Sequence, residues 1–124
     1  MQLPSALRDA DYCYITTAGR VTGSPHTVEI WFAVEAATLY VLAGGRDRAD
    51  FVRNVRKTPR VTVRIGDRAF AGTARIVGDG TDEDALARRL LLAKYRPRYS
   101  GDLDDWGRDA LPVAFDLDVT PAAR

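Results

Sequence analysis

The sequence contains few of the residues that bind transition metals or act as nucleophiles. It has one cysteine, Cys13, and one histidine, His26. A lone cysteine cannot form an internal disulfide, and it is compatible with a reducing cytoplasm. One histidine and one cysteine also supply neither the clustered ligands of a zinc site nor a nucleophile oriented by histidine. We therefore expect no metal ion, and we expect Cys13 to be a buried thiol.

Long apolar segments and a strong net charge are also missing. No apolar run is long enough to cross a bilayer, and residues 1–9 lack the basic-then-apolar layout of a signal peptide. We expect a cytoplasmic protein without a transmembrane segment, and association with a membrane surface stays open. The 124 residues carry a net charge of +1, so we expect one domain, 1–124, and no nucleic-acid partner.

Basic residues are nevertheless concentrated in the middle of the chain. Positions 46 to 68 hold three acidic residues and eight basic ones, which are Arg46, Arg48, Arg53, Arg56, Lys57, Arg60, Arg64 and Arg68. This segment predicts either a local anionic ligand or a solvated basic face. It lacks the interleaved aromatic residues of a platform for single-stranded nucleic acid.

The segment 16–26 combines two glycines with several groups that bind anions. Gly19 and Gly23 allow a tight curl of the backbone, which would turn N–H groups toward one point. Arg20 and His26 add side chains that favour an anion, and hydroxyl groups come from Thr16, Thr17, Thr22 and Ser24. The segment is either an anion site of the phosphate-binding kind or a glycine-containing hairpin turn.

Alternating apolar residues predict six strands. Their expected ranges are 12–17, 26–34, 38–43, 60–65, 68–77 and 111–119. The second and third should form a hairpin, and Gly66-Asp67 should turn the chain between the fourth and the fifth. Gly72, inside the fifth, indicates a bend or a close approach of another group.

Helical spacing and capping residues predict three helices, over 4–10, 49–57 and 85–95. Thr81 and Asp84 resemble a capping box at the start of the third. The expected buried stripe of that helix consists of Leu86, Leu90 and Ala93. Residues 98–109 should form a polar connection. Strands and helices in this order predict a mainly β protein, a small closed β-barrel with helical plugs.

Catalytic side chains are scarce, which favours a protein that leaves its chemistry to a cofactor. Gly44 and Gly45 would let a planar ring lie close to the backbone. The aromatic residues that could stack against such a ring, or could equally belong to the core, are Trp31, Phe51, Tyr95, Tyr99 and Trp106.

Three blocks of the sequence resemble one family. Residues 16–25, Thr-Thr-Ala-Gly-Arg-Val-Thr-Gly-Ser-Pro, are similar to the Thr-Thr-x-Gly-Arg-x-Ser/Thr-Gly-x-Pro signature of the deazaflavin-dependent nitroreductase family. Phe51-x-x-Asn54 with Pro59, and Trp106 with Leu111-Pro112, are similar to its later blocks. The resemblance implies a split β-barrel of the pyridoxamine phosphate oxidase, FMN-binding type. It also implies an oxidoreductase that uses the reduced deazaflavin coenzyme F420 to transfer hydride to a quinone, a nitroaromatic compound or a similar electron-poor acceptor.

The resemblance also implies roles for individual residues. The loop that would hold the phosphate and the acidic tail of the coenzyme contains Arg20, Val21, Thr22, Gly23, Ser24 and His26. The residues that would lie beside its ring and complete the pocket are Leu42, Ala43, Gly44, Gly45, Arg46, Arg48, Phe51 and Asn54. Tyr95 and Tyr99 match the region where the family places tyrosines over the substrate. Tyr99 would then be a proton donor or orienting hydroxyl, or else a lid residue that excludes water.

Some positions depart from the family pattern. Members often have Lys or Arg where this chain has Val21, and Phe51 replaces a frequent Trp. FMN therefore stays open as a cofactor, because its phosphate also binds Arg and Ser/Thr. A non-catalytic carrier of a cofactor or lipid is the other alternative. The expected partners are a small-molecule acceptor and, because split barrels commonly pair, a second copy in a homodimer.

Overall fold

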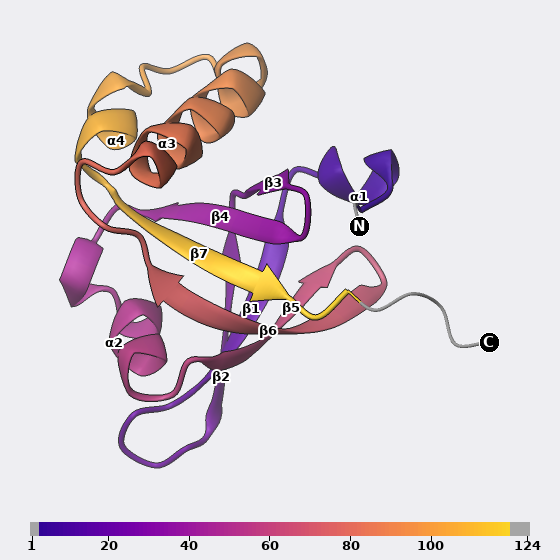
Figure 1. Ribbon diagram of the computed structural model, residues 1–124, viewed down its shortest axis with the longest axis vertical. Coiled ribbons are helices and arrows are strands. Elements are labelled where there is room, and N and C mark those ends of the chain that lie inside the picture. Colours follow the sequence, from indigo (N-terminus) through magenta and orange to yellow (C-terminus); the bar gives the residue numbers. More distant parts are fainter. Residues whose placement is uncertain (1–2, 120–124) are drawn as a thin grey trace.

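The structure, a computed structural model, describes residues 3–119 and contains an antiparallel seven-stranded sheet in the order β2-β1-β5-β6-β7-β4-β3 (Figure 1). The strands are β1 Cys13–Ala18, β2 Pro25–Ile30, β3 Ala33–Glu35, β4 Thr38–Ala43, β5 Arg60–Ile65, β6 Arg68–Ile76 and β7 Leu111–Leu117. The helices are α1 Ser5–Arg8, α2 Asp50–Lys57, α3 Asp82–Tyr95 and α4 Asp104–Asp109. Two 3-10 turns, Arg46–Arg48 and Arg96–Arg98, precede α2 and follow α3.

The main core lies inside the curve of the sheet. On β5, Val61, Val63 and Ile65 are buried while the residues between them are exposed, as their alternation predicts. These side chains pack with inward residues of β1, β4 and β7. Helix α2, which contacts β1 and β6, adds Phe51 and Val52 to the same cluster. The apolar face of α2 therefore plugs the barrel, as expected.

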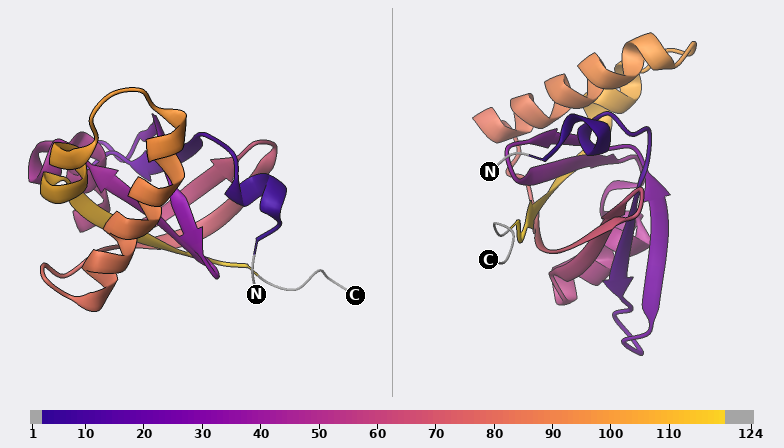
Figure 2. Two further views of the ribbon diagram at one scale, coloured as in Figure 1. Left: turned by 90° about the horizontal axis from the view of Figure 1, so that it is seen from above. Right: turned by 90° about the vertical axis from the view of Figure 1, so that its right-hand side faces the viewer.

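Strand β4 is buried on both faces. Leu39 and Val41 belong to the main core, whereas Tyr40 and Leu42 pack in a second cluster. Leu91 of α3 belongs to that second cluster, and α3 contacts β3 and β4. Figure 2 shows α3 and α4 together on one side of the sheet, over these strands. β4 thus separates the barrel interior from the helical layer.

The expected strand 26–34 is interrupted at Trp31 and Phe32. β2 pairs with β1, whereas β3 pairs with β4. The break arises because the backbone N–H and carbonyl of Phe32 are hydrogen-bonded to the hydroxyl of Tyr95 from α3. The predicted hairpin between 26–34 and 38–43 therefore holds for β3, which pairs with β4, and is wrong for β2, which does not. The prediction of a closed barrel is also wrong, since β2 and β3 are the two edges of the sheet and no strand pairing within residues 3–119 joins them.

The helical predictions need two corrections. The buried face of α3 carries Ala87, Leu91 and Tyr95 instead of the expected stripe, because Tyr95 anchors the end of the helix in the protein. The expected polar connection at 98–109 contains α4, which lies so close to α3 that a side chain at Gly107 would come within 2.7 Å of Leu92. No helix in the described part of the chain is long and apolar enough to cross a membrane.

Several local predictions are confirmed. The Thr81 hydroxyl accepts a hydrogen bond of 3.1 Å from the Asp84 backbone N–H at the start of α3. Gly66, with a φ of +59°, turns the chain between β5 and β6. At Gly72 the backbones approach closely, since a Cβ there would lie 3.2 Å from the carbonyl oxygen of Asp116. Cys13 is a buried free thiol, and burial raises its pKa to about 12.

Candidate functional site

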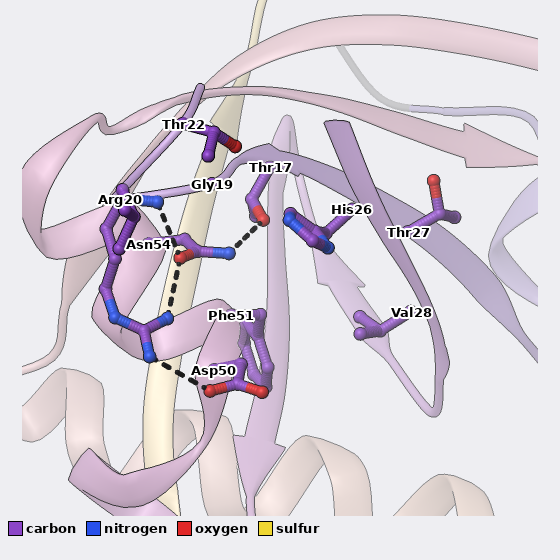
Figure 3. Close-up of a pocket in the computed structure, with 11 residues that line it drawn as sticks. Thr17, Gly19, Arg20, Thr22, His26, Thr27, Val28, Asp50, Phe51 and Asn54 are labelled. Atoms are coloured by element: carbon purple, nitrogen blue, oxygen red, sulfur yellow. Dashed lines mark hydrogen bonds and ion pairs between the residues drawn. The ribbon is translucent and has the colours of Figure 1, made fainter. Parts of the chain in front are cut away.

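A cavity of about 410 Å³ lies between the loop after β1, the start of α2 and strand β2 (Figure 3). It is lined by Thr17, Gly19, Arg20, Val21, Thr22, His26, Thr27, Val28, Asp50, Phe51 and Asn54. We call it the loop cavity. Two segments that are far apart in the sequence, residues 17–28 and 50–54, thus meet around one space.

The loop is a tight hairpin turn between β1 and β2. Gly19 donates its backbone N–H to the carbonyl of Ser24 at 2.8 Å, and Gly23 donates to the carbonyl of Gly19 at 2.8 Å. Gly23 has a φ of +79°, and a Cβ at Gly19 would lie 2.8 Å from the His26 ring, so both positions favour glycine. The Arg20 N–H is also used, since it donates to the Asn54 side chain. Three backbone N–H groups of the loop, those of Gly19, Arg20 and Gly23, are therefore already hydrogen-bonded within the protein.

Asn54 connects the loop to α2 and β1. Its side-chain oxygen accepts hydrogen bonds from the Arg20 backbone N–H at 3.2 Å and from the Arg20 guanidinium at 3.0 Å. Its amide nitrogen donates to the Thr17 hydroxyl at 3.0 Å. The residue is 2% exposed, so these three bonds satisfy an otherwise costly buried amide. Figure 3 shows the side chains of Arg20 and Asn54 next to each other on one side of the cavity, with His26 and Val28 on the other.

Arg20 is held from both sides. Its guanidinium forms an ion pair of 3.3 Å with Asp50, the first residue of α2. Its carbonyl oxygen accepts a hydrogen bond of 2.7 Å from Lys57 at the other end of that helix. About a third of the Arg20 side chain, 34%, stays accessible. Arg20 is therefore fixed in position and still able to contact an anion.

A second cavity of about 500 Å³ lies between β2, β4 and the segment around α4. We call it the aromatic cavity. It is lined by Tyr12, Glu29, Ile30, Trp31, Leu42, Tyr99, Asp102, Leu103 and Trp106. The Trp31 ring makes edge contacts with Tyr99 and Trp106, at centroid distances of 5.4 Å and 5.5 Å. This arrangement agrees with the sequence prediction, in which these three rings could form walls for a planar molecule.

The two tyrosines expected over a substrate occupy different environments. Tyr99 is 48% exposed and lines the aromatic cavity. Tyr95 is 1% exposed, and its ring stacks on Trp31 at 4.2 Å with an interplanar angle of 2°. Its hydroxyl accepts from the Phe32 N–H at 3.0 Å and contacts the carbonyl of Asp11 at 2.8 Å. Burial raises the pKa of Tyr95 to about 12. Tyr95 thus supports Trp31 from behind, and only Tyr99 reaches the cavity.

The two cavities follow one another along β2. Val28 lines the loop cavity and Ile30 lines the aromatic cavity. These residues are two apart on one strand, so their side chains lie on the same face. Residues of β2 therefore contribute first to a polar space with a fixed arginine and then to a more apolar space that includes four aromatic residues.

The structure gathers about half of the predicted site residues. The loop cavity includes Arg20, Val21, Thr22, His26, Phe51 and Asn54, and the aromatic cavity includes Leu42 and Tyr99. The predicted residues that line neither of these two cavities are Gly23, Ser24, Ala43, Gly44, Gly45, Arg46, Arg48 and Tyr95. Arg46 donates instead to the carbonyl of Asp109.

The basic segment does not form one surface. Arg56 pairs with Asp47 at 2.5 Å, and Arg60 pairs with Asp118 at 2.9 Å. None of the eight basic residues from 46 to 68 lines the loop cavity, whose cationic side chain is Arg20. The basic charges of this segment are therefore spread over several elements, and two of them have acidic partners.

Sequence reasoning missed several lining residues. Val28 and Ile30 were expected on one face of a strand, and that pattern was a usable signal for a wall. Asp50 could have been suspected as an acidic residue at a helix start. No local pattern indicated Asp102 and Leu103, because their place depends on how α4 packs against α3.

Comparison with solved structures defines the fold as a split β-barrel. An F420-H2 dependent reductase, FDR-A, has 23% identity and a TM-score of 0.68, over 87% of this chain and 94% of that one. A candidate pyridoxamine 5′-phosphate oxidase from Listeria innocua has 18% identity and a TM-score of 0.67, over 93% and 90%. The heme storage protein HutZ from Vibrio cholerae has 13% identity and a TM-score of 0.74, over 97% and 93%. At these identities the similarity concerns the fold.

The sequence gives the more specific result. The family model of the F420H(2)-dependent quinone reductases matches residues 2–118. The chain belongs to this family, and it is an oxidoreductase whose cofactor is coenzyme F420. The resemblance found in the three sequence blocks is confirmed.

Proposed function

We propose that this protein reduces a small electron-poor acceptor, such as a quinone or a nitroaromatic compound, at the aromatic cavity. The loop cavity would hold the phosphate and the acidic tail of the coenzyme. The observation that carries this proposal is that β2 contributes residues to two cavities, one with a fixed arginine and one with aromatic walls. The loop cavity suits the anionic end of an elongated coenzyme, and the aromatic cavity suits flat rings.

The residues present fit the coenzyme at its anionic end. The Arg20 guanidinium is oriented by Asn54 and keeps an accessible surface, so it can form charge-assisted hydrogen bonds to a phosphate. The His26 ring packs against Gly19 at the same cavity, and Thr22 adds a hydroxyl. Asp50 balances part of the Arg20 charge, so the anion would compete with this carboxylate for the guanidinium.

The residues also fit a flat ring. Leu42 lines the aromatic cavity, and the chain then continues through Ala43, Gly44 and Gly45 at its border. A Cβ placed on Gly44 would meet no atom within 4 Å, so there is open space beside this backbone. We propose that these residues lie beside the coenzyme ring, and that Arg46 and Arg48 lie at the outer end of the site.

When bound, the reduced coenzyme supplies a hydride. The chain would orient the acceptor between Trp31, Tyr99 and Trp106 and exclude water from it. Reduction of a quinone also needs a proton, and Tyr99, whose ring contacts Trp31 in this cavity, carries a hydroxyl group. A Tyr99→Phe variant distinguishes its two possible roles, since a lid needs the ring whereas a proton donor needs the hydroxyl.

The direct test is a titration with oxidised F420, followed by its own fluorescence. We expect saturable quenching, and then oxidation of the reduced coenzyme by menadione or a nitroaromatic compound. A preparation that releases FMN and ignores F420 would contradict the cofactor assignment. Binding without turnover of either acceptor class would identify a carrier instead of a reductase.

We also propose a cytoplasmic homodimer that does not bind nucleic acid. The outer side of the sheet presents the small side chains of Thr62, Ala69 and Ala71, which are exposed and would permit flat packing against a second copy. One related structure, 22% identical with a TM-score of 0.68, is described as a domain-swapped dimer. Sedimentation should give twice the mass of one chain, and Ala71→Glu should reduce it to one.

A further inference from the structure

In the aromatic cavity, the rings of Tyr99 and Trp106 are steeply inclined to the ring of Trp31. Trp31 is fixed by its stack on Tyr95, at 4.2 Å and 2°. Tyr99 and Trp106 are inclined to Trp31 by 75° and 89°. A planar guest can therefore lie on one ring face and have its edge covered by another. Cavities of this kind attract cations because the faces of aromatic rings are electron-rich.

The charged residues that line this cavity are all acidic. They are Glu29 and Asp102, and no Lys, Arg or His is among its lining residues. The carboxylate of Glu29 accepts a hydrogen bond from the Tyr14 hydroxyl, and that of Asp102 accepts one from the Asp104 N–H at 2.8 Å. Both carboxylates are thus held in place by hydrogen-bond donors.

The arginines near the cavity have other partners. Arg98 pairs with Asp11 at 2.7 Å, and Arg96 pairs with Asp104 at 2.9 Å. No arginine is among the residues that line the cavity beside Glu29 and Asp102. The aromatic cavity therefore has a negative character, opposite to that of Arg20 in the loop cavity.

We propose that the aromatic cavity selects planar acceptors that carry a positive charge, such as N-alkylated heteroaromatic rings, over neutral ones of the same shape. This inference rests on the proposed function, since it takes the aromatic cavity as the acceptor site. The ring faces supply cation–π attraction, and Glu29 and Asp102 supply the counter-charge.

The redox balance agrees with this choice. A planar cation that takes up one hydride, which is two electrons and one proton, becomes neutral. The hydride comes from the reduced deazaflavin, and no further proton is needed from the protein. A quinone, in contrast, needs a hydride and a separate proton to form the hydroquinone. A cationic acceptor therefore places no demand on a proton donor in the cavity.

The test uses tryptophan fluorescence, because both tryptophans of the chain, Trp31 and Trp106, line this cavity. The protein without coenzyme is titrated with 1-methylquinolinium and with its neutral isostere 1-methylnaphthalene. The measured quantity is the ratio of the two Kd values. Glu29→Gln and Asp102→Asn should each shift this ratio toward the neutral probe by about two- to fivefold, and the double variant by about tenfold. Asp67→Asn, in the turn between β5 and β6, is the matched control and should leave the ratio unchanged.

The inference is overturned if the double variant keeps the wild-type ratio, or if neither probe changes the tryptophan emission. Added salt gives a second measurement on the wild type alone, since it should weaken the cation and spare the neutral probe. The proposed function is tested separately by F420 titration. Normal F420 binding with an unchanged ratio refutes only the charge preference, whereas absent F420 binding refutes the proposed function.

Discussion

Replacing Tyr95 with phenylalanine tests whether this residue supports the site or takes part in the chemistry. The hydroxyl is buried, accepts from the Phe32 N–H at 3.0 Å and contacts the Asp11 carbonyl at 2.8 Å. Its removal leaves a buried main-chain donor and an acceptor without these partners. Each unsatisfied buried group costs about 1–3 kcal/mol, so we expect Tyr95→Phe to lower the free energy of unfolding by about 2–4 kcal/mol.

The phenylalanine ring can keep the stack on Trp31, which is 4.2 Å from Tyr95. Turnover per folded molecule should therefore stay close to that of the wild type. Tyr95→Leu removes the stack as well, and it should lower both the stability and the affinity for planar ligands. Urea unfolding followed by circular dichroism measures the stability, and steady-state reduction of menadione measures turnover.

Tyr99→Phe is the matched comparison, because Tyr99 is 48% exposed and lines the aromatic cavity. An exposed hydroxyl contributes little to stability, so the free energy of unfolding should change by less than about 0.5 kcal/mol. The reasoning is refuted if Tyr95→Phe is as stable as the wild type and loses turnover. That result would place the Tyr95 hydroxyl in the reaction.

Three further substitutions test separate parts of the structure. Burial raises the pKa of Cys13 from 9.0 to about 12, so above pH 9 the thiol of the unfolded chain loses its proton before that of the folded protein. The free energy of unfolding of the wild type should therefore fall by about 1.4 kcal/mol per pH unit relative to that of Cys13→Ala. Parallel pH profiles of the two proteins in urea unfolding would contradict this. Thr81→Ala removes the cap of α3 and should cost about 1 kcal/mol in thermal or urea unfolding, without changing F420 affinity. Asn54→Ala releases Arg20 and Thr17, and it should weaken both folding and F420 binding; unchanged F420 affinity in the folded variant would show that Arg20 needs no such support.

The sequence predicted the elements whose patterns are local. Strand β5 matches its prediction at both ends because Val61, Val63 and Ile65 alternate with exposed residues. The cap at Thr81 and the turn at Gly66 also depend on neighbouring residues alone. Periodicity failed at Phe32, where the apolar alternation continues but Tyr95 takes over the backbone hydrogen bonds. That partner is 63 residues away and leaves no trace in the local pattern.

The candidate site shows the same division. The motif around Arg20 predicted a loop that binds the coenzyme; the structure places Arg20 at a cavity, and three backbone N–H groups of the loop are hydrogen-bonded within the protein. Asn54 was expected to contact the coenzyme, whereas the structure shows it fixing Arg20. The difference between Tyr95 and Tyr99 also depends on tertiary packing, since both follow the same run of apolar residues and only one is buried.

The most direct measurement is the affinity for oxidised F420 of the wild type, Arg20→Ala and Arg64→Ala. Arg20 lines the loop cavity, whereas Arg64 lies over the Tyr14 ring elsewhere on the sheet. A charge-assisted contact with an anion contributes about 1.5–3 kcal/mol, so Arg20→Ala should weaken binding by about tenfold or more. Arg64→Ala should bind F420 as the wild type does. Equal affinities for all three proteins would contradict the placement of the coenzyme's anionic end at the loop cavity.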